Sequence, residues 1–264
     1  MMIRDILHEL INRKMSIDEA EKLLKLDHID KIHGAVVDHH RRHRTGIPEV
    51  IHGEHKDSSS IINIADTMLN QNGIVMITRI SEDCVQDLKQ LQIDDRVIEY
   101  YQGGTIVLKT KDYVIQKTGG KVGIITAGTS DISVAEECRA TALLMGCEVI
   151  TAYDVGIAGL HRLLKPLKKM IEADIDVIGV CAGMEGALPS VVAGLVDVPV
   201  IGIPVSTGYG LGAKGMGALT GMLQSCSPGL TVVNIDNGFN AGATAALIAN
   251  RIARHRNIQD SKKP

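Results

Sequence analysis

Thr126-Ala127-Gly128-Thr129-Ser130-Asp131 lies between an apolar run, residues 122–125, and a helical pattern, residues 132–145. A strand that breaks at a glycine and turns at once into a helix leaves unpaired N–H groups at the positive end of the helix dipole, where a phosphate binds well. Hydroxyl groups of Thr129 and Ser130 would add donors, and Asp131 would accept from ribose hydroxyls. The same residues suit an ordinary N-cap. The junction therefore favours a nucleotide site but leaves a purely structural turn open.

The C-terminal half repeats this alternation of strand and helix. Apolar runs predict five strands, at residues 121–127, 148–153, 176–181, 198–205 and 230–236. Helical patterns follow them at residues 132–145, 159–172, 186–196, 214–224 and 241–255. Five β-α units in a row predict an α/β fold with a doubly wound parallel sheet of the Rossmann type. Ligands of such sheets bind at the carboxyl ends of the strands, so the residues just after each strand are candidates for the site.

Composition changes near residue 118, which predicts a domain boundary. Of the 27 glycines, 21 lie in residues 119–242, while residues 176–249 carry only five charged side chains. A segment so apolar must be buried in the sheet or against other subunits. We expect a small mixed α/β domain over residues 1–117, a nucleotide-binding catalytic domain over residues 118–256, and a polar tail over residues 257–264.

The N-terminal part contains weaker patterns. Ser16-Ile17-Asp18-Glu19 is a capping-box pattern that predicts a helix over residues 20–26. Further strands are expected at residues 74–80, 97–101 and 105–109, and helices at residues 60–69 and 81–91. The basic segment His39-His40-Arg41-Arg42-His43-Arg44 is either a solvated edge or a set of arginines of which some reach a ligand phosphate.

Bulk properties exclude several classes of function. The net charge of −3 gives no electrostatic footprint for nucleic acid, and with no Trp and one Phe there are few stacking platforms for single strands. No apolar run approaches the roughly 20 residues that span a bilayer, and residues 1–7 begin an amphipathic helix rather than a signal peptide. The five cysteines are scattered and lack CxxC spacing. We therefore expect reduced thiols in a cytoplasmic protein, without a disulfide framework or zinc site.

Glu185 is the one acid in a long apolar stretch after the third predicted strand, Cys181-Ala182-Gly183-Met184-Glu185-Gly186-Ala187-Leu188-Pro189-Ser190. A lone carboxylate there is either a helix-start residue or a working base or metal ligand. We expect burial to suit it to general-base chemistry. Its neighbours Gly183 and Met184 are candidates for substrate contact.

Three later segments have two readings each. Pro204-Val205-Ser206-Thr207-Gly208-Tyr209-Gly210 is either a glycine turn or a loop that wraps a ligand through Ser206, Gly208 and Tyr209. Asp236 and Asn237, after the last strand, form a turn or bind ribose or amide groups. Cys226 lies in the polar turn Ser225-Cys226-Ser227-Pro228-Gly229. It is either a buried structural cysteine or a thiolate nucleophile.

Several motifs resemble PurE, the aminoimidazole ribonucleotide carboxylase or mutase of purine synthesis. They are Gly128-Thr129-Ser130-Asp131, the pair His161-Arg162, Leu188-Pro189, and Val198-Pro199-Val200-Ile201-Gly202-Ile203-Pro204-Val205. PurE carries a proton-shuttling histidine directly before the Leu-Pro pair, where this chain has Ala187. The chain departs from the PurE pattern at that catalytic position.

The chain is more similar to LarB, the PurE-like enzyme of nickel-pincer nucleotide cofactor biosynthesis. The likeness covers nearly the whole chain in six separated motifs. They are Arg44-Thr45-Gly46-Ile47-Pro48-Glu49-Val50-Ile51, residues 126–131, residues 153–162, residues 183–190, Ser225-Cys226 and residues 233–239. The resemblance implies nicotinic acid adenine dinucleotide as substrate, carbon dioxide or bicarbonate as co-substrate, magnesium for phosphoanhydride hydrolysis, and assembly into a homo-octamer.

The resemblance also implies roles for residues. Cys226 matches the attacking cysteine of the family, Glu185 is our candidate for the base, and residues 128–131 would hold a phosphate. Asp154, His161 and Arg162 join the candidate substrate-binding set, and the metal ligands are not identified. Two alternatives remain. A PurE-type carboxylase or mutase would need a proton carrier where Ala187 stands, and a non-enzymatic nucleotide sensor would use Cys226 only structurally.

Overall fold

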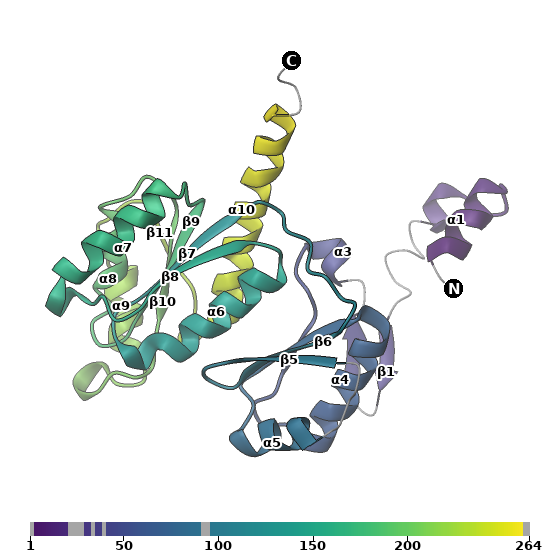
Figure 1. Ribbon diagram of the computed structural model, residues 1–264, viewed down its shortest axis with the longest axis horizontal. Helices are drawn as coiled ribbons and strands as arrows, with labels where there is room; N and C mark the ends of the chain where they lie inside the picture. The colour runs from purple at the N-terminus through teal and green to yellow at the C-terminus, as the bar shows by residue number, and fades with distance from the viewer. Residues whose placement is uncertain (1–2, 21–28, 33–34, 39–40, 91–95, 261–264) are drawn as a thin grey trace.

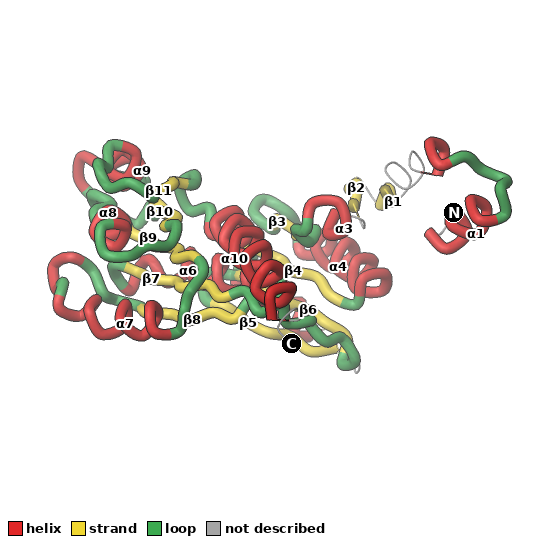
Figure 2. Tube along the Cα trace, turned by 90° about the horizontal axis from the view of Figure 1, so that it is seen from above, coloured by secondary structure: helices red, strands yellow, loops and turns green. Residues whose placement is uncertain are grey.

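The computed structural model describes residues 3–20, 29–32, 35–38, 41–90 and 96–260. It contains a C-terminal unit around a five-stranded sheet and an N-terminal unit around a four-stranded sheet (Figure 1). A third, two-stranded sheet pairs β1 (Ile29–Ile32) with β2 (Ala35–Asp38). Helix α1 (Ile3–Ile11) lies at the far end of the molecule from the C-terminal sheet in two views (Figures 1 and 2). Among the described residues, no helix is long and apolar enough to cross a membrane.

The C-terminal sheet is entirely parallel, as the alternation of strands and helices predicts. Its strands are β7 (Lys121–Thr126), β8 (Glu148–Ala152), β9 (Val177–Ala182), β10 (Val200–Pro204) and β11 (Leu230–Val232). Their order is β11-β10-β9-β7-β8. All four neighbouring pairs are parallel. The chain therefore winds first to one side of β7 and then to the other, so the strand order reverses between β7 and β9.

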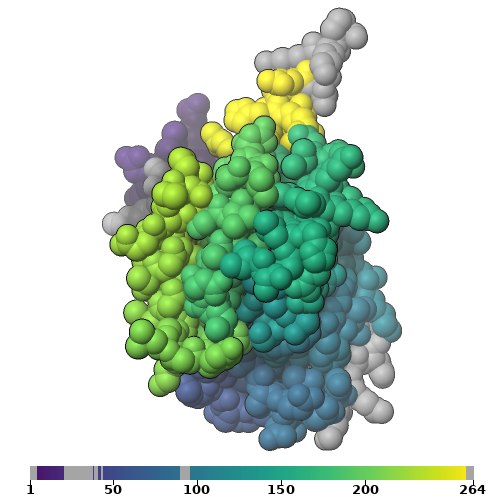
Figure 3. Space-filling model, turned by 90° about the vertical axis from the view of Figure 1, so that its left-hand side faces the viewer, coloured from purple at the N-terminus to yellow at the C-terminus, as the bar shows by residue number. Residues whose placement is uncertain are grey.

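Helices cover both faces of this sheet and form two apolar cores. One face packs against α6 (Ile132–Leu144) and α10 (Gly238–Asp260). The other packs against α7 (His161–Glu172), α8 (Leu188–Ala193) and α9 (Met216–Leu223). The segments that contain α7, α8 and α9 lie side by side in Figure 3, from teal through green to yellow-green. Because β9 is buried at every position, its sequence is a continuous apolar run rather than an alternating one.

Several element ends differ from the sequence prediction. Strand β11 ends at Val232 instead of residue 236, because the chain leaves the sheet and turns at Asp236, which has a φ of 56°. Helix α10 begins at Gly238 and continues to Asp260. The predicted helix end at residue 255 is therefore wrong, and residues 257–260 of the expected polar tail are helical. The reason is that a helix whose last turns face solvent can continue through polar residues.

The N-terminal sheet has the order β3-β4-β6-β5. Strands β4 (Ile74–Thr78), β5 (Arg96–Tyr101) and β6 (Thr105–Thr110) lie where the sequence predicts them, as do α4 (Ser58–Asn72) and α5 (Glu82–Gln90). The sequence pattern does not reveal β1, β2 or β3 (Val50–His52), because three or four residues are too few to establish a period of two. Strand β3 follows the short helix α3 (Arg41–Thr45).

The capping box at Ser16 forms as expected, since the Glu19 N–H donates to the Ser16 hydroxyl at 3.2 Å and the Glu19 carboxylate accepts from the Ser16 N–H at 2.9 Å. Residues 21–26 of the helix expected to follow lie outside the described residues. The first two histidines of the basic segment, His39 and His40, also lie outside them.

Helix α6 joins the two units. Val134 and Cys138 face the C-terminal core, while Ala140 and Leu144 pack against Met76 of the N-terminal sheet. Figure 1 shows α6 and α10 in the middle of the molecule, between the two sheets. A helix with apolar residues on two faces is expected to be buried on both. The N-terminal unit is thus fixed against the face of the C-terminal sheet that carries α6.

Candidate functional site

A cavity of about 320 Å³ lies at the carboxyl edge of the C-terminal sheet. We call it the strand-end cavity. The loops after β7 and β9 leave toward opposite faces of the sheet, because α6 covers one face and α8 the other, and a crevice opens between them. The doubly wound topology predicts a ligand at this position. Eight of the predicted site residues line the cavity: Gly128, Ser130, Asp131, Arg162, Gly183, Met184, Glu185 and Tyr209.

Asp131 closes the loop after β7. One carboxylate oxygen accepts from the Gly128 N–H at 2.8 Å, and the other accepts from the Thr207 hydroxyl at 3.2 Å. Burial raises the pKa of the Asp131 carboxyl, and these hydrogen bonds offset part of the rise. Since the Gly128 N–H is used inside the loop, the exposed residues Thr129 and Ser130 offer the donors for an anion. Thr129 itself lies outside the cavity lining that the described residues form.

Two glycines let neighbouring loops approach each other closely. A Cβ atom at Gly156 would lie 2.7 Å from the carbonyl oxygen of Ala127, and one at Gly183 would lie 3.0 Å from the Thr207 hydroxyl oxygen. A side chain at either position would push the loops apart. The sequence patterns do not single out Gly156 or Thr207 as site residues. Their place directly after predicted strands is the signal that could have found them.

An ion pair joins the loop after β8 to the start of α7. Arg162 donates to the Asp154 carboxylate at 2.7 Å, and both side chains are partly exposed. The Asp154 N–H donates to the Thr126 hydroxyl at 3.0 Å, which folds this loop over the end of β7. Arg162 lines the cavity, where a guanidinium suits a phosphate. His161 is exposed and, in the described chain, lies outside the lining.

Asp236 ties three loops together. Its carboxylate accepts from the Ser206 N–H at 2.8 Å. Its carbonyl oxygen accepts from Arg79, which follows β4 in the N-terminal unit. Arg79 also lies 3.7 Å from the buried carboxylate of Glu137 on α6. Asp236 and Ser206 therefore hold the rim of the site, and neither lines the strand-end cavity that the described residues form.

Two other predicted residues have structural positions. The Asn237 side chain accepts from the Asn240 N–H at 3.0 Å and so caps the start of α10. Gly208 lies against the backbone of Met184, where a Cβ atom would be 3.1 Å from the Met184 nitrogen. These residues shape the loops around the cavity without lining it in the described chain.

Glu185 lines the cavity but is exposed. The burial expected from its apolar flanks is wrong for the isolated chain. The physical reason is the backbone, because Met184 and Gly186 have φ values of 52° and 66°. These two left-handed turns carry the Glu185 side chain to the surface, while Ala182 and Leu188 on either side are buried. The carboxylate nevertheless borders the space in which a ligand would lie.

Cys226 lies outside the strand-end cavity of the described chain. Its loop is fixed by Ser190, whose hydroxyl donates to Ser225 at 2.7 Å and whose carbonyl accepts from Ser227 at 2.9 Å. The loop then runs to Gly229, which accepts from the N–H of Val200 at the start of β10. The Cys226 thiol is exposed, whereas the other four cysteines, all in described ranges, are buried. A buried structural role is therefore wrong for Cys226 in the isolated chain.

An open groove of about 630 Å³ continues from the cavity along α9. We call it the α9 groove. Met184, Glu185 and Tyr209 line both spaces, and Gln224, two residues before Cys226, lines the groove. Leu211 in its wall is fully exposed. The cavity and the groove together form a long space that leads from the loop after β7 to Gln224, two residues before Cys226.

A protein-held metal does not fit this site. The described residues contain no group of three or more His, Cys, Asp or Glu side chains that could hold a metal ion. The buried carboxylate of Asp131 is already engaged by Gly128 and Thr207. Magnesium that is bound mainly through substrate phosphates would need only one or two protein carboxylates.

Two family models match the chain. The AIR carboxylase model matches residues 121–262, which is more than half of the chain. The model of the LarB/PurE-like N-terminal domain matches residues 29–111. The first match covers the five-stranded sheet with its strand-end cavity, and the second covers the four-stranded sheet.

Individual relatives agree with these matches. The chain is 49% identical to an uncharacterized protein of Methanocaldococcus jannaschii over 94% of this chain and 96% of that protein. It is 33% identical to the N5-carboxyaminoimidazole ribonucleotide mutase of Thermotoga maritima over 48% of this chain and 74% of the mutase. The crystal structure of Treponema denticola PurE2 aligns with a TM-score of 0.39 at 16% identity, over 55% of this chain and 99% of that one, and adds no weight.

The resemblance to PurE-like and LarB-like proteins is confirmed, and membership indicates an enzyme of carboxylase or mutase type. The chain belongs to the AIR carboxylase family, as a member that carries the LarB/PurE-like N-terminal domain.

Proposed function

We propose that this protein carboxylates the pyridinium ring of nicotinic acid adenine dinucleotide and hydrolyses its phosphoanhydride. The products are pyridinium-3,5-biscarboxylic acid mononucleotide and AMP. The observation that carries the proposal is the exposed thiol of Cys226, two residues after Gln224 in the wall of a groove that begins at the strand-end cavity. The LarB/PurE-like domain before the AIR carboxylase domain supports it independently.

The cysteines differ in their readiness to react. Burial raises the pKa of Cys138 and Cys181 well above the ordinary range, and it raises the pKa of Cys147 to about 12. Burial also raises the pKa of Cys84. These four thiols stay protonated and inaccessible, and only a thiolate is a good nucleophile. Cys226 is therefore the cysteine that can reach a ligand.

A thiolate solves the chemical problem that the pyridinium ring presents. The ring is electron-poor and does not attack carbon dioxide. Addition of the Cys226 sulfur at ring carbon 4 makes a neutral dihydropyridine whose carbon 5 is enamine-like. Carbon 5 then bonds to carbon dioxide, a base removes the carbon 5 proton, and departure of the thiolate restores the aromatic ring. The net change replaces one ring proton by a carboxylate, and covalent catalysis divides it into easier steps.

Glu185 is our candidate for the base. Its carboxylate borders both the strand-end cavity and the α9 groove, so it faces a ring held at their junction. Contact with a ligand or a second copy of the chain would bury it further and strengthen it as a base.

The phosphates would lie at the other end of the site. Ser130 on the loop before α6 and Arg162 on α7 both line the strand-end cavity and supply hydroxyl and guanidinium donors. Magnesium would arrive with the substrate phosphates, where it neutralises charge during hydrolysis. Because no protein-held metal site fits, we assign no step to residues that ligate it.

We further propose that the working enzyme is a homo-oligomer, an octamer, in which a second copy closes the α9 groove. Tyr209, Leu211, Met216 and Leu223 are large apolar side chains between 55% and fully exposed on this side. Such a patch is unusual on a monomer and typical of a contact between subunits. Closure would bury the groove and bring its walls, with the Cys226 loops, around the ring.

The decisive experiment replaces the thiol. Cys226→Ala should lower formation of the dicarboxylated mononucleotide from nicotinic acid adenine dinucleotide and bicarbonate by about a thousandfold or more, because the nucleophile is removed. Liquid chromatography with mass spectrometry measures the product. Cys84→Ala, which removes a buried thiol on α5 of the N-terminal unit, is the matched control and should stay within about tenfold of wild type.

Intact-protein mass spectrometry gives an independent readout. Wild type mixed with an oxidised nicotinamide dinucleotide should gain the mass of one ligand, and Cys226→Ala should not. Unchanged turnover in Cys226→Ala would refute the thiolate mechanism. Tight ligand binding without any change in ligand or protein mass would instead point to a nucleotide sensor.

A PurE-type mutase is the second candidate, favoured by the 33% identity to the mutase of Thermotoga maritima. Ala187 lines the cavity at the position where the PurE pattern has its proton-shuttling histidine. A methyl group cannot carry a proton, so we expect no turnover of N5-carboxyaminoimidazole ribonucleotide. Turnover of that substrate by the purified protein, measured by liquid chromatography of the ring-carboxylated product, would reverse the order of the two candidates.

A further inference from the structure

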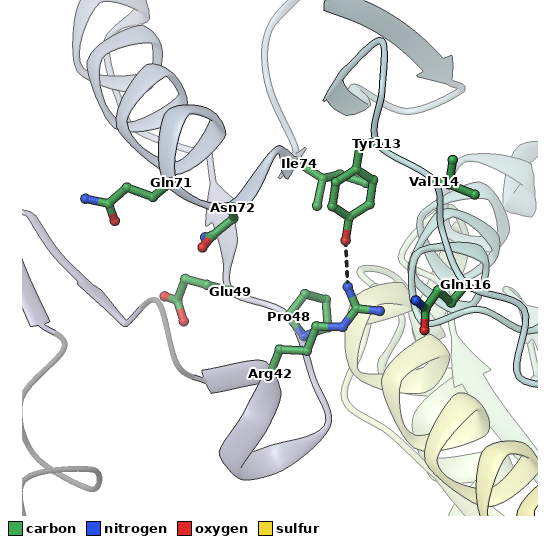
Figure 4. A pocket seen from close by; sticks show the side chains of 9 residues that line it. All are labelled: Arg42, Pro48, Glu49, Gln71, Asn72, Ile74, Tyr113, Val114 and Gln116. Atoms are coloured by element: carbon green, nitrogen blue, oxygen red, sulfur yellow. Dashed lines mark hydrogen bonds between the residues drawn. The ribbon is translucent and has the colours of Figure 1, made fainter. Parts of the chain in front are cut away.

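A second cavity, of about 570 Å³, lies in the N-terminal unit (Figure 4). We call it the α3 cavity. It is bounded by α3, the end of α4, the start of β4 and the linker between β6 and β7, residues 111–120. It shares no lining residue with the strand-end cavity within the described chain. The proposed carboxylation does not use it.

The lining of this cavity contains two charged side chains, Glu49 and Arg42, and the one that suits an anion is Arg42. Its neighbours on α3 are neutralised, since Arg41 pairs with Glu49 at 3.2 Å and Arg44 pairs with Asp38. The Arg42 guanidinium instead donates to the Tyr113 hydroxyl at 2.9 Å. Among the described residues no carboxylate lies within ion-pair distance of it. Of the arginines on α3, Arg42 is thus the one that lines a cavity and has no carboxylate partner in the part of the chain that the structure describes.

The bond to Tyr113 prepares an anion site. A phenol can accept one hydrogen bond and donate another. The Tyr113 oxygen accepts from Arg42, so its hydroxyl hydrogen remains to be donated to a further acceptor. Figure 4 shows the two side chains approaching each other across the cavity from α3 and from the linker. A phosphate beside them would receive charge-assisted hydrogen bonds from the guanidinium and one from the phenol.

The remaining walls suit an organic ligand. Carboxamide side chains of Asn72 and Gln116 lie on opposite sides of the cavity, and Pro48 and Ile74 add apolar surface. A carboxamide presents a donor and an acceptor side by side, which matches the edge of a nucleobase. The volume lies within the range of small-molecule sites and is far larger than an inorganic anion needs.

We infer that the α3 cavity binds a nucleoside monophosphate, with the phosphate at Arg42 and Tyr113 and the base at the carboxamide of Gln116. The ligand would join α3 to the linker that leads into the C-terminal unit. This inference does not depend on the proposed carboxylation, since it concerns different residues and needs no chemistry.

Calorimetric titration of the full chain tests the inference, with AMP, adenosine and inorganic phosphate as the probes. Wild type should bind AMP, with adenosine and phosphate each about tenfold weaker or more, because each lacks one part of the ligand. Arg42→Gln should weaken AMP binding about tenfold or more, since it removes the charge. Arg44→Gln on the same helix, outside the cavity, is the matched control and should bind as wild type does.

Two further variants separate the outcomes. Gln116→Leu removes a carboxamide without touching the charge and should weaken AMP binding but not phosphate binding. Arg162→Gln alters the strand-end cavity and should leave the Arg42-dependent binding intact. Thermal unfolding of each variant establishes that it is folded, and Gln116→Leu replaces Arg42→Gln as the test if the latter is not.

Loss of AMP binding in Arg162→Gln, together with wild-type binding in Arg42→Gln, would overturn the inference and assign the ligand to the strand-end cavity. Phosphate that binds as tightly as AMP would also overturn it, because the base would then contribute nothing. No binding of any probe would do the same. Failure of the Cys226→Ala experiment bears only on the carboxylation.

Discussion

At the scale of the residue, Asp131 couples the active edge of the sheet to pH. Burial raises the pKa of this carboxyl above its ordinary value of 3.8. Between the ordinary and the raised pKa, the folded chain holds the proton that the unfolded chain has lost. The stability contribution of Asp131 is therefore full at low pH and falls as the pH rises through this window.

Asp131→Asn removes that dependence, because an amide has no proton to lose and its oxygen can still accept from Gly128. We expect the free energy of unfolding of the variant, relative to wild type, to rise as the pH increases through the window. Urea unfolding of both proteins at several pH values measures the difference. A difference that stays constant with pH would contradict the buried, proton-binding role of Asp131.

At the scale of the element, the contact between α6 and α10 depends on glycine. A Cβ atom at Gly242 on α10 would lie 2.4 Å from the carbonyl oxygen of Cys138 on α6. Gly242→Ala should lower the free energy of unfolding by about 1 to 3 kcal/mol, the usual cost of overpacking, despite the better helix propensity of alanine.

Gly194→Ala is the matched control for this prediction. A Cβ atom at Gly194 would meet its nearest atom, the carbonyl oxygen of Val191, at 3.6 Å, an ordinary contact distance. Its stability should remain within about 0.5 kcal/mol of wild type in the same urea titration. Equal effects of the two substitutions would contradict the prediction. They would mean that α6 and α10 move apart at a lower cost in free energy than the 2.4 Å distance at Gly242 indicates.

At the scale of the whole molecule, the exposed apolar side chains along the α9 groove predict self-association. Leu211→Asp places a charge in the proposed contact and should shift the mass in light scattering from an octamer to smaller species. Ile11→Asp on α1 changes an equally apolar, exposed residue at the other end of the chain. It should leave the mass unchanged. A monomeric wild type would end the proposal that a second copy closes the groove.

Much of the fold was predictable, for local reasons. Apolar runs such as residues 121–127 and 176–181 are strands because parallel strands are buried on both faces, and the glycine junction at Gly128 marks the turn into α6. Short strands were not predictable. Val50, Ile51 and His52 form β3 only because β4 lies beside them in register, and nothing in three residues indicates such a partner.

The candidate site divides in the same way. Gly128, Asp131, Gly183 and Glu185 were predictable as residues that line the strand-end cavity, because the ends of parallel strands meet at one edge. The exposure of Glu185 was not, since it depends on two left-handed turns beside it. That Arg42 has no carboxylate partner among the described residues was equally hidden. It depends on which carboxylates the fold brings to Arg41 and Arg44.

The amino-acid sequence by itself determined the longer strands, most of the helices and the edge of the sheet at which the strand-end cavity opens, because hydrophobic period and glycine placement are local properties of the chain. Only the tertiary structure decided which side chains face solvent, which charges are paired, and how far Cys226 stands from the cavity. A local sequence pattern does not indicate those properties, because they arise from contacts between segments that are distant in the chain.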